Sequence, residues 1–440
     1  MKKFILVFLF VLSLFSLSGK TPSPRYIILF IGDGMALPQR LLAEEFSRKT
    51  EKKPLLMNSF PYHATTHTVS ANSLTTDSAA SATAIACGVK TNNGRIGTDP
   101  KNNKLVSAAE MARDKGKKVG IITTVTLNHA TPSGFYGHRK SRTEYYELGL
   151  DLVSSRFDFF GGGGLHSFNK LSPDLFTLAK QNNYVISRGR NALDSMKKEN
   201  KNIFLASSEK SNMPYAIDLS GNIPTLAEIT EKAIQLLDNP KGFFLMVEGG
   251  LIDYAGHSNE AATNMREVLA LDAAVKKAYE FYQKHPEETL ILVTGDHETG
   301  GLTLGVKGKK FDPLVLAQQK SSSGVFKSRF TALKKEGKIK SFEDAKAIVT
   351  EYFGLLFQSK NPKEILLVTP AEQKAMEQAF HQGKLPSFLH NLMNQKAGLG
   401  WSTTSHTAIP VLTTATGKGA ENFTGFIENT FIAEKIKELL

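Results

Sequence analysis

Cysteine is almost absent from this chain, since Cys87 is the single thiol among its 440 residues. One cysteine excludes an intrachain disulfide, and it excludes zinc sites that need two or more thiolates. Any metal bound by this chain must therefore be held by histidine and carboxylate side chains. The sequence also lacks a GxGxxG motif, so the glycine run at 161–164 gives no sign of nucleotide binding.

Long apolar runs are also missing, apart from one stretch near the N-terminus. Two lysines precede the apolar residues from Phe4 to Leu17, and the small residues Ser16 and Ser18 suit a signal-peptidase site. This stretch is shorter than the ~20 residues of a membrane-spanning helix, and no cysteine follows it for lipidation. We therefore predict a cleaved signal peptide over residues 1–19, a periplasmic or secreted protein of residues 20–440, and no stable membrane anchor.

The net charge of +12 would by itself suit a protein that binds nucleic acid or a membrane surface. The excess is concentrated between Lys307 and Lys340, where basic residues far outnumber Asp312 and Glu336. Because this segment has no RNA-binding aromatic motif and no helix-turn-helix signature, we interpret it as a solvated basic insert. A binding patch is the alternative, but the sequence requires no nucleic-acid partner.

Short β-branched and aromatic runs alternate with helical patterns along the chain. Four runs are typical of strands buried on both faces: Tyr26–Ile31, Lys118–Ile122, Phe243–Val247 and Thr289–Val293. Helical patterns lie between them at Leu105–Lys115, Thr225–Leu237 and Met265–Tyr282. This alternation predicts an α/β fold with a doubly wound, mainly parallel central sheet and helices on both faces. The strand pattern fades from about 305 to 400, which predicts an inserted, basic, helical subdomain.

Each predicted strand is followed by residues that carry chemistry. These are Gly32-Asp33-Gly34, the segment Thr123-Thr124 leading to His129-Ala130-Thr131-Pro132, Glu248-Gly249-Gly250, and Gly295-Asp296-His297-Glu298. A single Asp-Gly after a strand is usually a turn. Since the carboxyl ends of parallel strands form a ligand crevice, four such segments indicate one shared site.

Two further patterns sharpen this expectation. Asp253 and His257 are four residues apart, which places both side chains on one face of a helical turn where they can bind one metal; a surface acid-base pair is the alternative. Ser78 stands at the start of an alanine-rich run that ends at Gly88. It is either a good N-terminal helix residue or a nucleophile whose hydroxyl lies in the positive field of a helix N-terminus.

Together these residues resemble the bacterial alkaline phosphatase family. The motifs that carry the resemblance occur in the family's order: Gly32-Asp33-Gly34-Met35, Thr76 to Ala84, His129-Ala130-Thr131-Pro132, Val247-Glu248-Gly249 with Asp253 and His257, Thr294-Gly295-Asp296-His297, and Ser405-His406-Thr407. The resemblance implies a phosphomonoesterase with a phosphoserine intermediate, two zinc ions and a third metal, usually magnesium. The oligomeric state stays open, with a homodimer among the options.

The resemblance also implies a role for each matching residue. Asp253, His257 and His406 would bind the first zinc, and Asp33, Asp296, His297 and Ser78 the second, while Asp33, Thr131 and Glu248 would hold the third metal. Arg142 would hold two phosphate oxygens, although a plain surface cation is the alternative. With three divalent ions, four carboxylates, a Ser78 alkoxide and Arg142, the site is formally +2, which matches a phosphomonoester dianion.

Two positions near the expected site depart from the best-known pattern of the family. Position 129 is His where the magnesium-dependent subtype has Asp, and position 254 is Tyr rather than Lys or His. His129 would favour zinc over magnesium in the third site, or would act only through water. A related metal-dependent phosphodiesterase or sulfatase is the alternative function, although such enzymes usually place Thr or a modified Cys where Ser78 stands.

Overall fold

The structure is a computed structural model that describes residues 23–440 except 168, 207–210, 307 and 362–363. The predicted signal peptide at 1–19 and Lys307 of the basic segment lie outside these residues. The main sheet contains β1 (Tyr26–Gly32), β2 (Tyr62–His67), β3 (Lys118–Thr123), β4 (Phe159–Gly162), β5 (Tyr184–Arg188), β6 (Lys201–Leu205), β7 (Phe243–Gly249), β8 (Thr289–Gly295), β13 (Val411–Gly417) and β14 (Gly425–Glu428).

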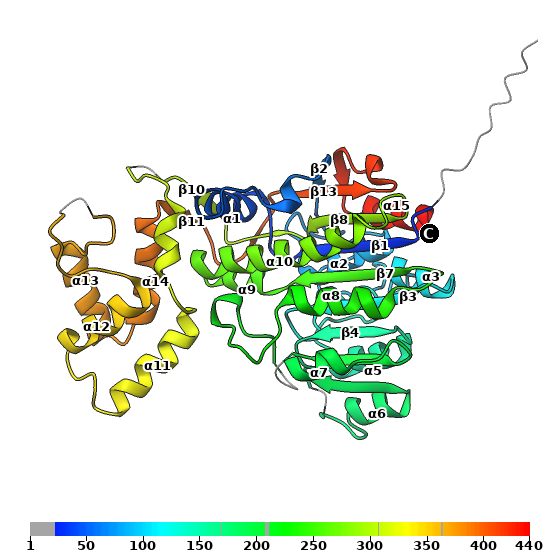
Figure 1. Cartoon of the computed structure of the whole chain (residues 1–440), viewed down its shortest axis with the longest axis horizontal. Coiled ribbons are helices and arrows are strands. Elements are labelled where there is room, and N and C mark those ends of the chain that lie inside the picture. The colour runs from blue at the N-terminus through cyan, green and yellow to red at the C-terminus, as the bar shows by residue number, and fades with distance from the viewer. Residues whose placement is uncertain (1–22, 168, 207–210, 307, 362–363) are drawn as a thin grey trace, which may run out of the picture.

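The described strands form a ten-stranded sheet with the order β14-β2-β13-β8-β1-β7-β3-β4-β6-β5 (Figure 1). β1 pairs in parallel with β7 on one side and β8 on the other. β13 alone among these strands runs antiparallel to its neighbours, which are β8 and β2. The sheet is therefore mainly parallel, as predicted, and its carboxyl ends meet at one edge.

Helices cover both faces of this sheet. The α-helices of the described chain are α1 (Leu37–Thr50), α2 (Ser78–Cys87), α3 (Ala108–Asp114), α4 (Ala130–Ser133), α5 (Tyr145–Ser155), α6 (Leu175–Gln181), α7 (Arg190–Ser195), α8 (Leu226–Leu237), α9 (Leu251–His257), α10 (Ala261–Tyr282), α11 (Ser323–Lys335), α12 (Phe342–Phe353), α13 (Pro370–His381), α14 (Leu385–Lys396) and α15 (Thr430–Leu439), of which α11 to α14 do not cover the sheet. Short 3-10 helices are η1 (Leu56–Asn58), η2 (Ala216–Asp218), η3 (Pro313–Gln318) and η4 (Ala420–Asn422). None of the described helices has the length and apolar character needed to cross a membrane.

Alternation along β1 divides the core between the two faces. Ile28 and Phe30 join a cluster with residues of α1, α8 and α10, whereas Leu29 and Ile31 join a second cluster with residues of α2, α3 and α15. All seven residues of β1 are buried, which explains why the sequence shows an unbroken apolar run there instead of a polar alternation.

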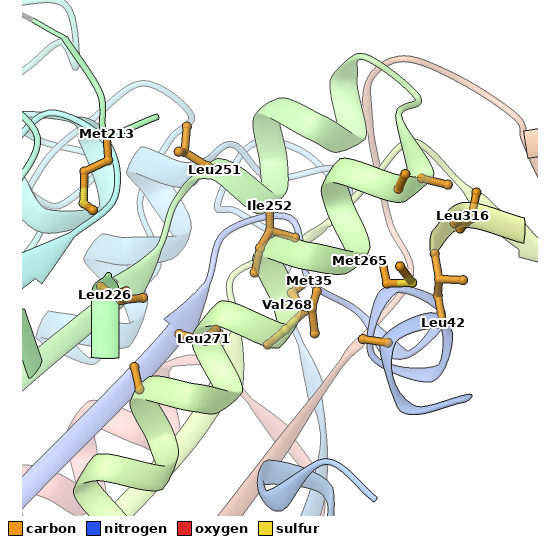
Figure 2. Close-up of a cluster of buried hydrophobic side chains, with 14 of the residues drawn as sticks. Met35, Leu42, Met213, Leu226, Leu251, Ile252, Met265, Val268, Leu271 and Leu316 are labelled. Atoms are coloured by element: carbon orange, nitrogen blue, oxygen red, sulfur yellow. The ribbon is translucent and has the colours of Figure 1, made fainter. Parts of the chain in front are cut away.

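Four helices, α11 to α14, lie between β10 (Leu302–Leu304) and β11 (Leu399–Trp401), which pair with each other in antiparallel orientation. These helices lie to one side of the sheet, in yellow and orange in Figure 1. The segment packs on the body of the protein near its start. Figure 2 shows Leu316 of η3 beside Leu42 of α1 and Met265 of α10.

The fold class predicted from the sequence is confirmed, and β1, β3, β7 and β8 coincide with the four predicted strands. Two helices differ at their starts. α3 begins at Ala108 instead of Leu105, because Ser107 Oγ accepts a hydrogen bond from Glu110 N and Glu110 Oε2 accepts one from Ser107 N. α10 begins at Ala261, four residues before the predicted Met265.

Candidate active site

The turn after β1 and the end of β8 bring Asp33 and Asp296 together at the carboxyl edge of the sheet. Gly34 has a φ of +73°, and a Cβ there would lie 2.8 Å from Thr299 Oγ1 and 2.9 Å from the Cα of Asp253. Only glycine fits that conformation and that approach. The Gly34 N–H donates to Asp296 Oδ1 (3.0 Å), so this turn joins the two strand ends.

Ser78 is the first residue of α2 and is only 1% exposed. Asp77 caps this helix by accepting a hydrogen bond from a backbone N–H of the first turn (2.9 Å). Ser81 Oγ donates to the backbone oxygen of Asp296 (2.7 Å) and so holds the helix against the end of β8. The Ser78 Oγ lies 3.2 Å from His297 Nε2, at the positive end of the helix dipole.

His257 and His406 are oriented by backbone carbonyls. Since a carbonyl can only accept, the Nδ1–H of His257 donates to Thr404 O (2.6 Å) and the Nδ1–H of His406 donates to Thr76 O (3.0 Å). Both Nε2 atoms are then unprotonated when the rings are neutral, and they lie 3.2 Å apart. Asp253 is 3.3 Å from the first and 3.5 Å from the second. Two imidazoles and one carboxylate thus face a common point.

His297 faces a second point. Its ring is fully buried, and its Nε2 lies 3.3 Å from both Asp33 Oδ1 and Asp296 Oδ2. Thr299 Oγ1 lies 3.3 Å from the opposite ring nitrogen. Burial holds the pKa of His297 well below its usual value, and the nearby His406 acts in the same direction. The ring beside Ser78 is therefore neutral, which is the form of imidazole that can bind a metal.

A third group contains Asp33, His129 and Glu248, whose candidate ligand atoms all lie within 4.8 Å of one another. Thr131 Oγ1 donates to Asp33 Oδ2 (3.4 Å), and Thr123 Oγ1 donates to Glu248 Oε2. Asp33 belongs to the second and third groups at once. It can therefore bridge two cations.

Four buried polar atoms in these groups have no hydrogen-bond partner among the described residues: Asp33 Oδ1, Glu248 Oε1, Asp296 Oδ2 and His129 Nδ1. An unpaired buried polar atom is expensive, and buried carboxylates are normally paired or bound to metal. Oxygen and imidazole nitrogen are the donors that divalent cations prefer in proteins. The residues present thus fit the metals that the sequence analysis expects.

The pKa values of the carboxylates support the same interpretation. Burial, with the charge of neighbouring carboxylates, raises the pKa of Glu248 to about 8 and that of Asp296 to about 7, and it raises the pKa of Asp33 well above its usual value. Burial also tends to raise the pKa of Asp253, but hydrogen bonds from His257 and His406 in their protonated forms hold that pKa well below the ordinary value. Without cations the site retains protons, which a divalent ion would displace.

Arg142 lies between the Ser78 helix and the third group. Its Nη1 donates to Asp77 Oδ2 (3.0 Å), and its Nη2 lies 3.4 Å from His129 Nε2. Burial opposes the charge of the guanidinium, but the Asp77 charge outweighs it and raises the pKa of Arg142. The side chain is 26% exposed, so it can reach a bound substrate.

His129 and Tyr254 lie close to each other, with ring centroids 6.1 Å apart. His129 is buried, and burial together with the charge of Arg142 lowers its pKa to about 3, so the ring is neutral. Tyr254 is 38% exposed and lies at the rim. The contacts described above thus connect all the residues singled out from the sequence.

Thr299 was missed in the sequence, and Thr123 and Glu298 were placed near the site without a role. Thr299 Oγ1 donates to Asp253 Oδ1 (2.5 Å), and Thr123 supports Glu248. Glu298 is fully buried and accepts a hydrogen bond from Thr407 Oγ1 (2.5 Å), which ties the His297 segment to the His406 segment. Their positions could have indicated these roles. Thr123 directly follows a predicted strand, and Glu298 and Thr299 lie one and two residues after the predicted ligand His297.

Comparisons with known proteins agree with this geometry. A family model described as alkaline phosphatase matches residues 24–158 and 162–440. Alkaline phosphatase 4 of Bacillus subtilis (strain 168) is 32% identical over 432 residues, covering 94% of this chain and 88% of that protein.

Solved structures show the same similarity. The cold-active alkaline phosphatase from a psychrophile, Shewanella sp., has a TM-score of 0.83 and 32% identity, and the match covers 94% of this chain and 99% of that chain. A mutant of the alkaline phosphatase of the Antarctic bacterium TAB5 has a TM-score of 0.69 and 27% identity, covering 96% and 99%. In that mutant a histidine is replaced by aspartate, and magnesium is bound in the M3 site.

Proposed function

The chain belongs to the alkaline phosphatase family and hydrolyses phosphate monoesters, and we propose that Ser78 is the nucleophile of this reaction. The observation that carries this proposal is the place of Ser78. Its buried hydroxyl lies at the N-terminus of α2, 3.2 Å from His297 Nε2. In-line attack by the Ser78 oxygen on phosphorus would expel the alcohol and leave a phosphoserine, which water then hydrolyses.

We assign the metal ligands as the sequence analysis predicts. The first site consists of Asp253, His257 and His406, and the second of Asp33, Asp296, His297 and Ser78. Mixed carboxylate and imidazole donors favour zinc in both sites. Divalent cations bound there would favour ionisation of water and of the Ser78 hydroxyl, and would neutralise charge that develops on the phosphoryl oxygens.

For the third site we propose Asp33, Thr131 and Glu248 with His129 nearby, and weak magnesium binding or replacement of magnesium by zinc. Neutral imidazole suits zinc better than magnesium, which prefers carboxylate and water. The TAB5 mutant, with aspartate in place of a histidine and magnesium in its M3 site, supports a link between this kind of exchange and magnesium binding.

Arg142 would hold two phosphate oxygens in a bidentate contact, since Asp77 fixes its guanidinium from one side and leaves the exposed side free for substrate. The formal charge of +2 that the sequence analysis counts for the loaded site suits a monoester dianion. A diester or a sulfate monoanion would leave surplus positive charge in the site.

We make four further proposals, on the signal peptide, the localisation, the insert and the oligomeric state. We propose that residues 1–19 form a signal peptide, that the mature protein is periplasmic or secreted, and that residues 305–400 form a basic inserted subdomain. A homodimer is the assembly we propose to test first, by light scattering of the mature chain.

The decisive experiment is to trap the covalent intermediate. The protein is quenched in acid during turnover of p-nitrophenyl phosphate, and its peptides are analysed for phosphoserine. Phosphate is expected on Ser78 and absent from Ser78→Ala, while Ser81→Ala, which removes a neighbouring hydroxyl of the same helix, should still carry it. Phosphate on another residue would refute the assignment. Turnover of the bis-ester or the sulfate above that of the monoester would favour the alternative function.

A further inference from the structure

His257 is weakly held for a residue assigned to a metal site. It is the last residue of α9, and its side chain is 41% exposed, so packing does not fix the ring. Outside the assigned metal ligands, its hydrogen-bond partner in the described part of the chain is the backbone oxygen of Thr404 (2.6 Å). The direction of its Nε2 therefore depends on where two backbone segments lie, the α9–α10 turn and the segment 403–404.

Asn259 joins these two segments. It has a left-handed φ of +52°, and its backbone N–H donates to Gly256 O (2.9 Å). In the orientation that satisfies both neighbours, its side-chain amide donates to Gly256 O (3.0 Å) and to Thr403 O (2.9 Å). Asn259 thus links the turn that follows His257 to the segment 403–404, whose Thr404 oxygen accepts the hydrogen bond of His257.

The inserted helices hold this turn from outside the catalytic body. Asn394 of α14 is 4% exposed, and its Nδ2 donates to Asn259 O (2.7 Å) while its Oδ1 accepts from Ala261 N (3.4 Å). Glu260, between them in the chain, accepts hydrogen bonds from Gln319 Nε2 and from Ser323 N and Oγ, all at 2.8 Å. The turn Asn259-Glu260-Ala261 is therefore hydrogen-bonded to α14 through Asn394 and to the segment 319–323 through Glu260.

We propose that Asn394 is a positioning residue for the first metal site, and that the insert slows the loss of metal from that site by fixing the turn that carries His257. This inference rests on the proposed role of His257 as a ligand. Asn394 touches neither metal nor substrate. It acts through Asn259, whose position sets the distance between His257 and its carbonyl partner at Thr404.

A purely structural role for Asn394 leads to a different expectation. If Asn394 merely anchored the insert, its loss would destabilise the whole protein and speed the release of metal from all sites alike. Outer-shell partners of a metal ligand instead change the affinity of that one site, typically by ten- to a hundredfold. The ratio between the release rates of the sites distinguishes the two roles.

The test uses the full-length, zinc-loaded protein diluted into an excess of a chromogenic zinc chelator, with each release phase followed by absorbance. Asn394→Ala is compared with the wild type and with Asn391→Ala, the same substitution at an exposed position of the same helix. His257→Ala identifies the phase that belongs to the first site. Asn394→Ala should accelerate that phase roughly tenfold and leave the other phases within twofold, and Asn391→Ala should match the wild type.

Each other outcome has a defined meaning. Equal acceleration of all phases, or no acceleration, in Asn394→Ala overturns the positioning role while the His257 assignment stands. Unchanged zinc content and release in His257→Ala refutes that assignment instead, and with it the inference. If Asn394→Ala does not fold, Asn394→Ser is used, since it keeps a small polar side chain but cannot span both contacts. The same selective acceleration is expected, and its absence overturns the proposal.

Discussion

Removal of the metals should make the stability of this protein fall as the pH rises from 5 to 8. Glu248 is fully buried, and its pKa of about 8 lies above the ordinary value of 4.5. Between these two values the folded chain binds more protons than the unfolded chain, so the free energy of unfolding decreases with rising pH. Asp296, with a pKa of about 7, acts in the same direction. His129 and His297 have pKa values below the ordinary 6.5, so they oppose the trend below that pH and make it shallower there.

The size of the effect follows from the same pKa values. One pKa unit corresponds to ~1.4 kcal/mol, so Glu248 contributes on the order of 4 kcal/mol across this window. A chain of about 400 ordered residues has an unfolding entropy of roughly 0.8 kcal/mol/K, so the unfolding midpoint should fall by ~5 °C. Because the carboxylates interact, their contributions do not add independently.

The assay is thermal unfolding of metal-free and zinc-loaded protein at several pH values between 5 and 8. The zinc-loaded protein controls for buried acids elsewhere, such as Glu267, whose pKa burial also raises to about 8. Glu248→Gln should weaken the pH dependence of the metal-free protein, because the neutral amide does not titrate. A metal-free midpoint that stays constant or rises with pH, or that falls equally in both forms, would refute the reasoning.

Three further predictions concern turnover and metal specificity. Chelation should abolish activity, and zinc should restore it where magnesium alone does not; full activity of metal-free protein at alkaline pH would contradict this. Arg142→Ala should weaken inhibition by inorganic phosphate and lower monoester turnover while zinc content stays unchanged, and an unaltered inhibition constant would make Arg142 a surface charge. His129→Asp should strengthen magnesium activation, because it replaces an imidazole with a carboxylate; identical magnesium titrations of activity and bound metal in both proteins would show that position 129 does not select the third metal.

Much of the catalytic edge could be predicted because its residues follow unbroken apolar strands. Asp33, Glu248 and Asp296 end or follow β1, β7 and β8, and a parallel sheet necessarily collects such positions at one edge. The motif match then assigned His129 and His406, which no strand pattern would have identified.

The remaining contacts depend on distant segments whose proximity leaves no local pattern. Thr299 supports Asp253, 46 positions earlier, and Asn394 supports the turn at Asn259, 135 positions earlier. A threonine or an asparagine at such positions looks like any other surface polar residue. The sheet edge formed by β2 and β14 was missed for a related reason, since Tyr62–His67 and Gly425–Glu428 carry polar and exposed residues rather than apolar runs.

The strands that pair with β2 are synthesised at the very end of the chain. β2 pairs with β13 and β14, both of which belong to the last 30 residues of the chain. During synthesis, β2 is therefore made long before either of the strands that pair with it. The same holds for α2, which carries Ser78 and packs against α15 at the end of the chain. This edge of the sheet and the packing of α15 on α2 are therefore expected to form only after nearly the whole chain has been synthesised.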